Sequence, residues 1–233
     1  PAFPGLDVGV SVKKMAVIIP SRSGDGYRPK GLLDAFISWA DTTDGESDFY
    51  IGLDTDDADK YSDVLPNMIR NTAQLLLGPN QRFVPKLNRL GLFLAEAGYQ
   101  YVFFMGDDHR FRTKGWENSF IDAGGISYGN DLLQGSRLPT AVCIDSNIIK
   151  KLGFMAPPCL QHMYADDFWR DFGSDLGILH YHDSITIEHM HFSKGKSPAD
   201  SQYFANAALH KADKIAYDQY KATQYLEDLK RFK

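Results

Sequence analysis

The sequence predicts a single α/β domain with a mostly parallel central sheet and helices on both faces. Apolar runs of strand length alternate with helical patterns through the first hundred residues, an order typical of a parallel sheet. Acidic or small-residue loops follow the apolar runs, where a parallel sheet binds its ligands. The chain has 233 residues, 43% of them hydrophobic and 24% charged, which is enough for one sizeable core.

Each predicted element has a local reason. Residues 1–14 contain Pro and Gly without periodicity, so we expect a loose arm or an added remnant there, with the domain covering 15–233. Pro20 closes the first strand, and Gly98 ends a helix with leucines at helical spacing. The elements are a strand at 16–19, a helix at 30–40, a strand at 48–53, a helix at 62–72, a strand at 74–77, a helix at 86–97 and a strand at 101–105.

The second half is predicted in less detail. A strand-like run covers 140–144, a helix covers 167–172, and a strand covers 184–192. Ser197 and Pro198 look like an N-cap and a first helical residue, so we expect a C-terminal helical segment over 197–233. The tyrosines of this segment, at 203, 217, 220 and 225, are expected to be packing and surface positions.

The apolar run 101–105 stops at Gly106 and is followed by Asp107, Asp108 and His109. Two adjacent carboxylates at a strand end repel each other unless a positive group lies beside them, and their oxygens suit Mg²⁺ or Mn²⁺. The sequence therefore indicates a metal site. The alternative is an acidic turn that merely ends the strand.

A second group of candidate ligands lies about eighty residues later. In the predicted strand 184–192, alternation places Ile185, Ile187, His189 and His191 on one face. Two histidines on one face favour metal binding over a partly buried structural histidine. Imidazole beside carboxylate fits Mn²⁺, and also zinc or iron.

The loops 20–26, 54–59 and 106–109 each follow a strand. We therefore expect them to meet at one edge of the sheet. Their acidity alone would also be explained by a need for solvated turns.

Charge and composition exclude several functional classes. The net charge of −5 argues against a broad DNA or membrane footprint, and no apolar run approaches the roughly 20 residues that cross a bilayer. Cys143 and Cys159 are too few for a disulfide framework, so we expect a cytoplasmic protein. A local basic channel remains possible, formed by Arg110, Arg112, Lys114, Arg137, Lys194 and Lys196.

The order of several motifs resembles the GT-A class of nucleotide-sugar glycosyltransferases, especially family 2. These motifs are A-V-I-I-P-S at 16–21, Asp54, N-R-L-G at 88–91, Asp107-Asp108, Asp166-Asp167 and the late histidines. The segments M-G-D-D-H-R-F-R-T-K-G-W and I-E-H-M-H-F-S-K-G-K further resemble small glycosyltransferase-like proteins encoded by bacteriophages, for which the host cytoplasm would be the setting. The resemblance covers residues 15–203 and rests on the order and spacing of the motifs.

The resemblance implies a metal-dependent transferase that uses a nucleoside diphosphate sugar, expected to be a UDP-sugar. Asp108 and one of His189 and His191 would hold Mn²⁺ or Mg²⁺, which stabilises the departing diphosphate. Asp107 would contact the ribose or the sugar of the donor, and Asp54 its base or ribose. The other implied donor contacts are Pro20, Ser21, Arg22 and Asn88 at the nucleotide, and Lys194 and Lys196 at the phosphates. Arg22 and the lysines would otherwise be solvated charges, and Asn88 a residue of the N-cap type.

An inverting transfer, which the resemblance implies, needs a base for the acceptor hydroxyl. Asp166 and Asp167 precede a predicted helix, and the second position is the expected base, although Asp-Asp in place of the commoner Glu-Asp leaves the choice between them open. The alternative is acidic stabilisation of a helix N-terminus.

The expected acceptor is a hydroxyl group of unknown class. Hydroxymethylpyrimidine DNA, a phage or host protein and a polysaccharide are the candidates. Two rival functions are a metal-dependent phosphoesterase or nuclease, and a non-catalytic nucleotide-sugar-binding module.

Overall fold

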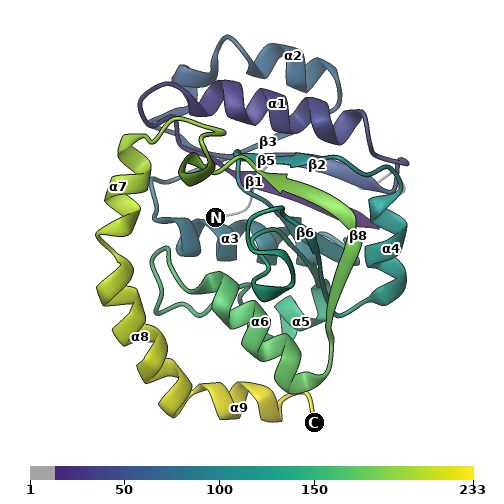
Figure 1. Ribbon diagram of the computed structural model, residues 1–233, viewed down its shortest axis with the longest axis vertical. Coiled ribbons are helices and arrows are strands. Elements are labelled where there is room, and N and C mark those ends of the chain that lie inside the picture. The colour runs from purple at the N-terminus through teal and green to yellow at the C-terminus, as the bar shows by residue number, and fades with distance from the viewer. Residues whose placement is uncertain (1–13) are drawn as a thin grey trace.

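The computed structural model describes residues 14–233 and contains a curled eight-stranded sheet with helices on both sides (Figure 1). The strand order is β3-β2-β1-β4-β7-β6-β8-β5. Of the arm predicted at 1–14, residues 1–13 lie outside the described residues. The α/β prediction with helices on both faces is confirmed.

The first half forms the parallel part of the sheet. β1 pairs in parallel with β2 and β4, and β2 with β3, as the alternation predicts. The predicted helix at 62–72 is shorter than expected, because Pro66 is tolerated only in the first turn and the helix begins beside it. The elements are β1 Met15–Pro20, α1 Arg28–Ala40, β2 Ser47–Asp54, η1 Ala58–Tyr61, α2 Leu65–Arg70, β3 Gln74–Gly78, α3 Phe83–Glu96 and β4 Tyr101–Phe104.

The second half makes the sheet mixed. β7 runs antiparallel to β4 and β6, β6 runs parallel to β8, and β8 runs antiparallel to β5. β5 and β6 are absent from the prediction, because β5 has only three residues and β6 contains Gly129. The glycine is required, since a Cβ there would lie 2.5 Å from the carbonyl oxygen of Ile185. The elements are β5 His109–Phe111, α4 Trp116–Ala123, β6 Ile126–Asn130, η2 Gly135–Arg137, β7 Val142–Asp145, α5 Ser146–Leu152, α6 Ala165–Leu176 and β8 Leu179–His189.

The central strand β1 is buried on both faces of the sheet. In β1, Met15, Val17 and Ile19 face one apolar cluster, and Ala16 and Ile18 face the other. Helices α1, α2 and α4 contribute to the first cluster, and α3, α5 and α6 to the second. Figure 1 shows α1 and α2 on one side of the sheet and α3, α5 and α6 on the other.

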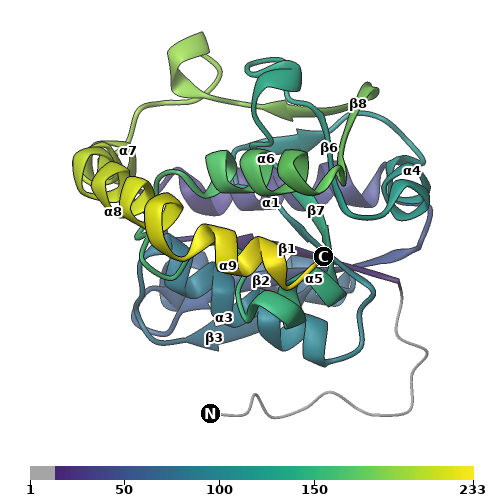
Figure 2. The ribbon, with the colours of Figure 1, turned by 90° about the horizontal axis from the view of Figure 1, so that it is seen from below.

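The C-terminal segment corrects the predicted N-cap. It is divided into η3 Phe192–Lys194, α7 Ser201–Ala207, α8 His210–Thr223 and α9 Tyr225–Lys230. The N-cap is Asp200 rather than Ser197, because the Asp200 carboxylate accepts a hydrogen bond from the backbone N–H of Tyr203. Helices α8 and α9 lie against the side of the sheet that carries α3, α5 and α6 (Figure 2). In the described residues, no helix is both long enough and apolar enough to cross a membrane.

Candidate functional site

The loops after β1, β2 and β4 meet at one edge of the sheet, which confirms the predicted convergence. Ser21 Oγ donates to Asp107 Oδ2 over 2.5 Å, and Ser23 Oγ donates to Asp57 Oδ1 over 2.7 Å. Arg22 Nη1 donates to Asp54 Oδ2 over 2.9 Å. The three strands are neighbours and parallel, so their carboxyl ends lie side by side.

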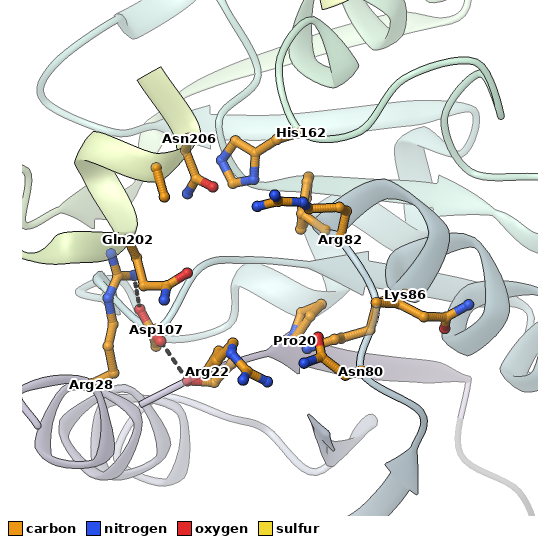
Figure 3. A pocket seen from close by; sticks show the side chains of 14 residues that line it. Pro20, Arg22, Arg28, Asn80, Arg82, Lys86, Asp107, His162, Gln202 and Asn206 are labelled. Atoms are coloured by element: carbon orange, nitrogen blue, oxygen red, sulfur yellow. Dashed lines mark hydrogen bonds and ion pairs between the residues drawn. The ribbon is translucent and has the colours of Figure 1, made fainter. Parts of the chain in front are cut away.

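A cavity of about 480 Å³ lies at this edge (Figure 3). Its lining includes the predicted donor residues Pro20, Ser21, Arg22 and Asp107. Four cationic side chains border it, namely Arg22, Arg28, Arg82 and Lys86. A cavity with this excess of positive charge suits an anionic ligand such as a diphosphate.

Asp54 does not line the cavity but holds two of these cations. Its side chain is fully buried, with Arg22 Nη1 at 2.9 Å from one oxygen and Lys86 Nζ at 2.8 Å from the other. Burial lowers the pKa of Lys86, although Asp54 acts in the opposite direction. As placed, Asp54 positions Arg22 and Lys86 rather than presenting a vacant carboxylate to the cavity.

Asp107 is held by Arg28, a residue that the sequence analysis missed. Arg28 Nη1 lies 2.7 Å from Asp107 Oδ1, and Arg28 Nε lies 2.7 Å from Asp200 Oδ2. Burial acts to lower the pKa of Arg28, but these carboxylates raise it above its ordinary value. The sequence held one signal for such a residue: two adjacent carboxylates, Asp107 and Asp108, repel each other and therefore require a cation nearby.

Asp108, His109 and His189 form the candidate metal site. His109 in β5 is paired with His189 in β8, and their rings stack with centroids 4.1 Å apart. Asp108 Oδ1 lies 3.1 Å from His109 Nδ1, and Asp108 Oδ2 lies 3.4 Å from His189 Nε2. One ligand atom from each residue lies within 4.8 Å of the others. A carboxylate with two imidazoles fits Mn²⁺, zinc or iron.

The electrostatics of this group favour ligand behaviour. Burial acts to raise the pKa of Asp108, but hydrogen bonds from His109 and His189 overcome it and hold the pKa well below its ordinary range. Burial, together with the neighbouring His189, lowers the pKa of His109. Asp108 is therefore ionised and His109 neutral near pH 7, as metal ligation requires.

Further side chains orient these candidate ligands. Asp131 Oδ1 accepts three backbone N–H groups, and Asp131 Oδ2 accepts from Thr140 Oγ1 over 2.7 Å. The Thr140 hydroxyl lies 3.3 Å from His109 Nε2, and Asp131 Oδ2 lies 3.9 Å from His189 Nδ1. Such outer contacts fix the rings of histidine ligands. Tyr203 donates to Asp108 Oδ2 over 2.6 Å, so it is more than the packing position expected.

His191 lies outside the three-residue group. β8 ends at His189, not at Phe192 as predicted, because the Met190 N–H turns to bond the carbonyl of Asp108. His191 is the N-cap of η3, and its Nδ1 lies 2.8 Å from Ser193 Oγ. The alternation predicted for the strand therefore does not extend to His191.

Asp166 and Asp167 lie in the first turn of α6. Asp167 Oδ1 is 2.9 Å from Arg170 Nη2. Burial, together with the adjacent Asp167, raises the pKa of Asp166 to about 6. Neither carboxylate is among the described residues that line the cavity, but His162, four residues before Asp166, is.

Asn88 and the two lysines are not among the described residues that line the cavity. Asn88 sits inside α3, where its Oδ1 accepts from the N–H groups of Met155 and Ala156 and its Nδ2 donates to the Ala156 carbonyl. Its amide thus joins α3 to a loop. Lys194 is exposed in η3, and Lys196 Nζ lies 2.6 Å from Glu188 Oε1.

Of the six cations of the predicted basic channel, Arg110, Arg112 and Lys196 line a second cavity, of about 500 Å³, and none of the six lines the first. Arg110 is buried and donates to the carbonyls of Asp107 and His109. Arg112 and Lys196 both pair with Glu188. These contacts neutralise or bury three of the six cations that the channel requires.

We compared the chain with known proteins to identify solved structures of similar fold. No protein-family model matches the chain, and no curated protein matches its sequence. Among solved structures, TarS 1–349 of S. aureus in complex with UDP has a TM-score of 0.55 at 14% identity, covering 75% of this chain and 59% of its own. The same protein with UDP-GlcNAc gives a TM-score of 0.53 at 14% identity, with 75% and 57% covered. The chain thus spans less than two thirds of the TarS structures that it matches.

A second neighbour is matched over nearly the whole chain. The mannosyltransferase PcManGT of Pyrobaculum calidifontis, in complex with GDP-Man and Mn²⁺, has a TM-score of 0.55 at 11% identity, covering 95% of this chain and 73% of its own. At these identities the likeness shows the fold alone. That fold is GT-A-like.

Proposed function

We propose that this protein is a glycosyltransferase that moves a sugar from a nucleoside diphosphate sugar to an acceptor hydroxyl and requires Mn²⁺ or Mg²⁺. One observation carries the proposal: the Asp108, His109 and His189 group lies beside a cation-lined cavity at the carboxyl ends of β1 and β4. This arrangement provides for a metal ion and a diphosphate at adjacent positions. The GT-A-like fold supports it.

Asp108 and His189 are the proposed metal ligands, with His109 in place of His191 as the third. Their carboxylate and neutral imidazole atoms fit Mn²⁺. When bound, the metal ion supplies Lewis-acid stabilisation of the leaving diphosphate. His191 lies next to this group, with its ring centroid 5.0 Å from that of His189.

The donor is proposed to lie between the metal group and the loop after β1. Arg22, Arg28 and Lys86 would hold the phosphates by charge-assisted hydrogen bonds. Ser21 and Asp107 would contact the donor from the same wall, with Asp54 acting through the two cations that it holds. Uridine as the base rests on the sequence resemblance and on the TarS complexes, whereas GDP-Man in PcManGT supports only a nucleotide sugar.

Asp166 is proposed as the general base in preference to Asp167. A base works best when its pKa lies near the operating pH, and that of Asp166 is raised to about 6. Asp167 is held by Arg170 at 2.9 Å, which leaves it less available. An inverting outcome is the expectation from the resemblance.

The acceptor is proposed only as a hydroxyl group. Hydroxymethylpyrimidine DNA and a phage or host protein are retained from the resemblance, with polysaccharide as a third class. Transfer of labelled sugar to hydroxymethylpyrimidine DNA, unmodified DNA and a phage structural-protein lysate separates them. Nuclease-insensitive label in the lysate alone excludes DNA as the preferred acceptor.

A thermal-shift panel of nucleotide sugars, with and without Mn²⁺, tests the proposal. Stabilisation that requires both the sugar nucleotide and the metal is expected. Stabilisation by metal alone would favour a phosphoesterase, although the described residues contain a single three-residue ligand group where a two-metal site needs bridging carboxylates. Donor binding without transfer to any acceptor would favour the non-catalytic module.

A further inference from the structure

One face of α7 lines the cavity. Gln202, Ala205 and Asn206 have the i, i+3, i+4 spacing that puts side chains on one side of a helix, and all three border the cavity. Phe204, on another side of the helix, is 69% exposed. Figure 3 shows Asn206 beside His162, across the cavity from Arg22 and Lys86. We call His162, Gln202 and Asn206 the roof of the cavity.

His162 is held in place through its backbone. Asp213 of α8 is buried, and its carboxylate accepts the N–H groups of Gln161, His162 and Met163 at 3.0, 2.8 and 2.7 Å. The His162 ring packs on Phe83 with centroids 5.0 Å apart. Burial lowers the pKa of His162 to about 4, so the ring is neutral at pH 7.

The roof has unused hydrogen-bonding capacity. Within the described part of the chain, no side-chain hydrogen bond is formed by His162, Gln202 or Asn206. A neutral imidazole and two amides offer both donors and acceptors without net charge. Arg22 and Lys86 lie across the cavity from His162 and Asn206, and a further cation, Arg82, lies beside His162 (Figure 3). Phosphate groups are therefore drawn to these cations, whereas the neutral imidazole and amides of the roof match hydroxyl groups.

We infer that the roof recognises the hydroxyl groups of the transferred sugar, and so determines which nucleotide sugar is used. This inference rests on the proposed function. The sugar must lie between the departing diphosphate and the base, and His162 precedes the proposed base by four residues. Sites that hydrogen-bond substrate hydroxyls reject analogues strongly, because an unmatched polar group is left unpaired.

The roof is also attached to the carboxylates of the site. Asp200, the N-cap of α7, accepts from Arg28 at 2.7 Å, and Arg28 in turn holds Asp107. Tyr203 donates from α7 to Asp108 over 2.6 Å. The Arg28–Asp200 ion pair and the Tyr203–Asp108 hydrogen bond therefore hold α7 against the carboxylates of the site.

The test is calorimetric binding of UDP, GDP, UDP-glucose, UDP-galactose, UDP-GlcNAc and GDP-mannose in the presence of Mn²⁺. The variants are Gln202→Ala, Asn206→Ala and His162→Phe, which keeps a ring against Phe83. Gln219→Ala, in an exposed position of α8, is the matched control. For the roof variants we expect unchanged affinity for the free diphosphate, and roughly tenfold weaker binding of the preferred sugar nucleotide for each hydrogen bond lost.

The outcomes separate the two proposals. If the unaltered protein binds none of the nucleotide sugars, the proposed function fails and the inference falls with it. If it binds them and all three roof variants keep its affinities and its order of preference, the inference alone is overturned. Equal weakening of diphosphate and sugar nucleotide also overturns it, because that result would assign the roof to the nucleotide.

Discussion

Replacing Asp213 by alanine tests how the cavity is held together. The buried carboxylate accepts three backbone hydrogen bonds from residues 161–163. A hydrogen bond to a charged group contributes about 1.5–3 kcal/mol, but the freed loop relaxes and regains water, so we expect a total loss near 3 kcal/mol rather than the sum. Urea denaturation of Asp213→Ala measures this change in the free energy of unfolding.

The control lies on the same helix. Asp218 is exposed and pairs with Lys214 one turn away, an ion pair that solvent screens and that contributes little to stability. Asp218→Ala should therefore be close to neutral. If Asp213→Ala lost no more stability than Asp218→Ala, the three backbone contacts would not hold the loop. We also expect Asp213→Ala to weaken sugar-nucleotide binding more than diphosphate binding, because His162 lies on the released loop.

The remaining predictions concern metal, base and phosphates. Asp108→Ala should abolish Mn²⁺-dependent donor binding and leave the far-ultraviolet circular dichroism unchanged; unaltered affinity with metal would contradict the site. Asp166→Asn should keep donor affinity and lose roughly 10²- to 10⁴-fold in transfer rate, while the rate of the unaltered protein falls as the pH drops through about 6. The pKa of Asp166 is raised from its ordinary 3.8 to about 6 in the folded protein, so the ionised carboxylate destabilises the fold above pH 6, and this cost is absent below pH 3.8. Asp166→Asn should therefore raise the melting temperature at pH 7.5. A lower melting temperature for this variant at pH 7.5 would contradict the raised pKa. Arg22→Ala should weaken UDP binding about tenfold, and calorimetry that shows no change would remove Arg22 from the phosphate site.

Local sequence patterns were enough to predict the parallel strands of the first half of the chain and the acidic loops that follow them. β1 and β4 read as continuous apolar runs because both faces of these strands are buried, and Gly106 marks where the strand gives way to polar residues. The meeting of the loops after β1, β2 and β4 follows from parallel pairing alone. The sequence could therefore predict Asp107 and Asp108 as site residues, along with Ser21 and Arg22.

The partners of these residues were decided by tertiary structure. His109 meets His189 only because β5, three residues long and without a readable period, pairs with β8. Arg28 lies 79 residues from Asp107, and Tyr203 lies 95 residues from Asp108, so no local spacing records either contact. Hydrophobic periodicity and turn chemistry act between near neighbours in the chain and therefore appear in the sequence. The cation that offsets a buried carboxylate, and the helix that covers a cavity, are selected by packing across the whole fold.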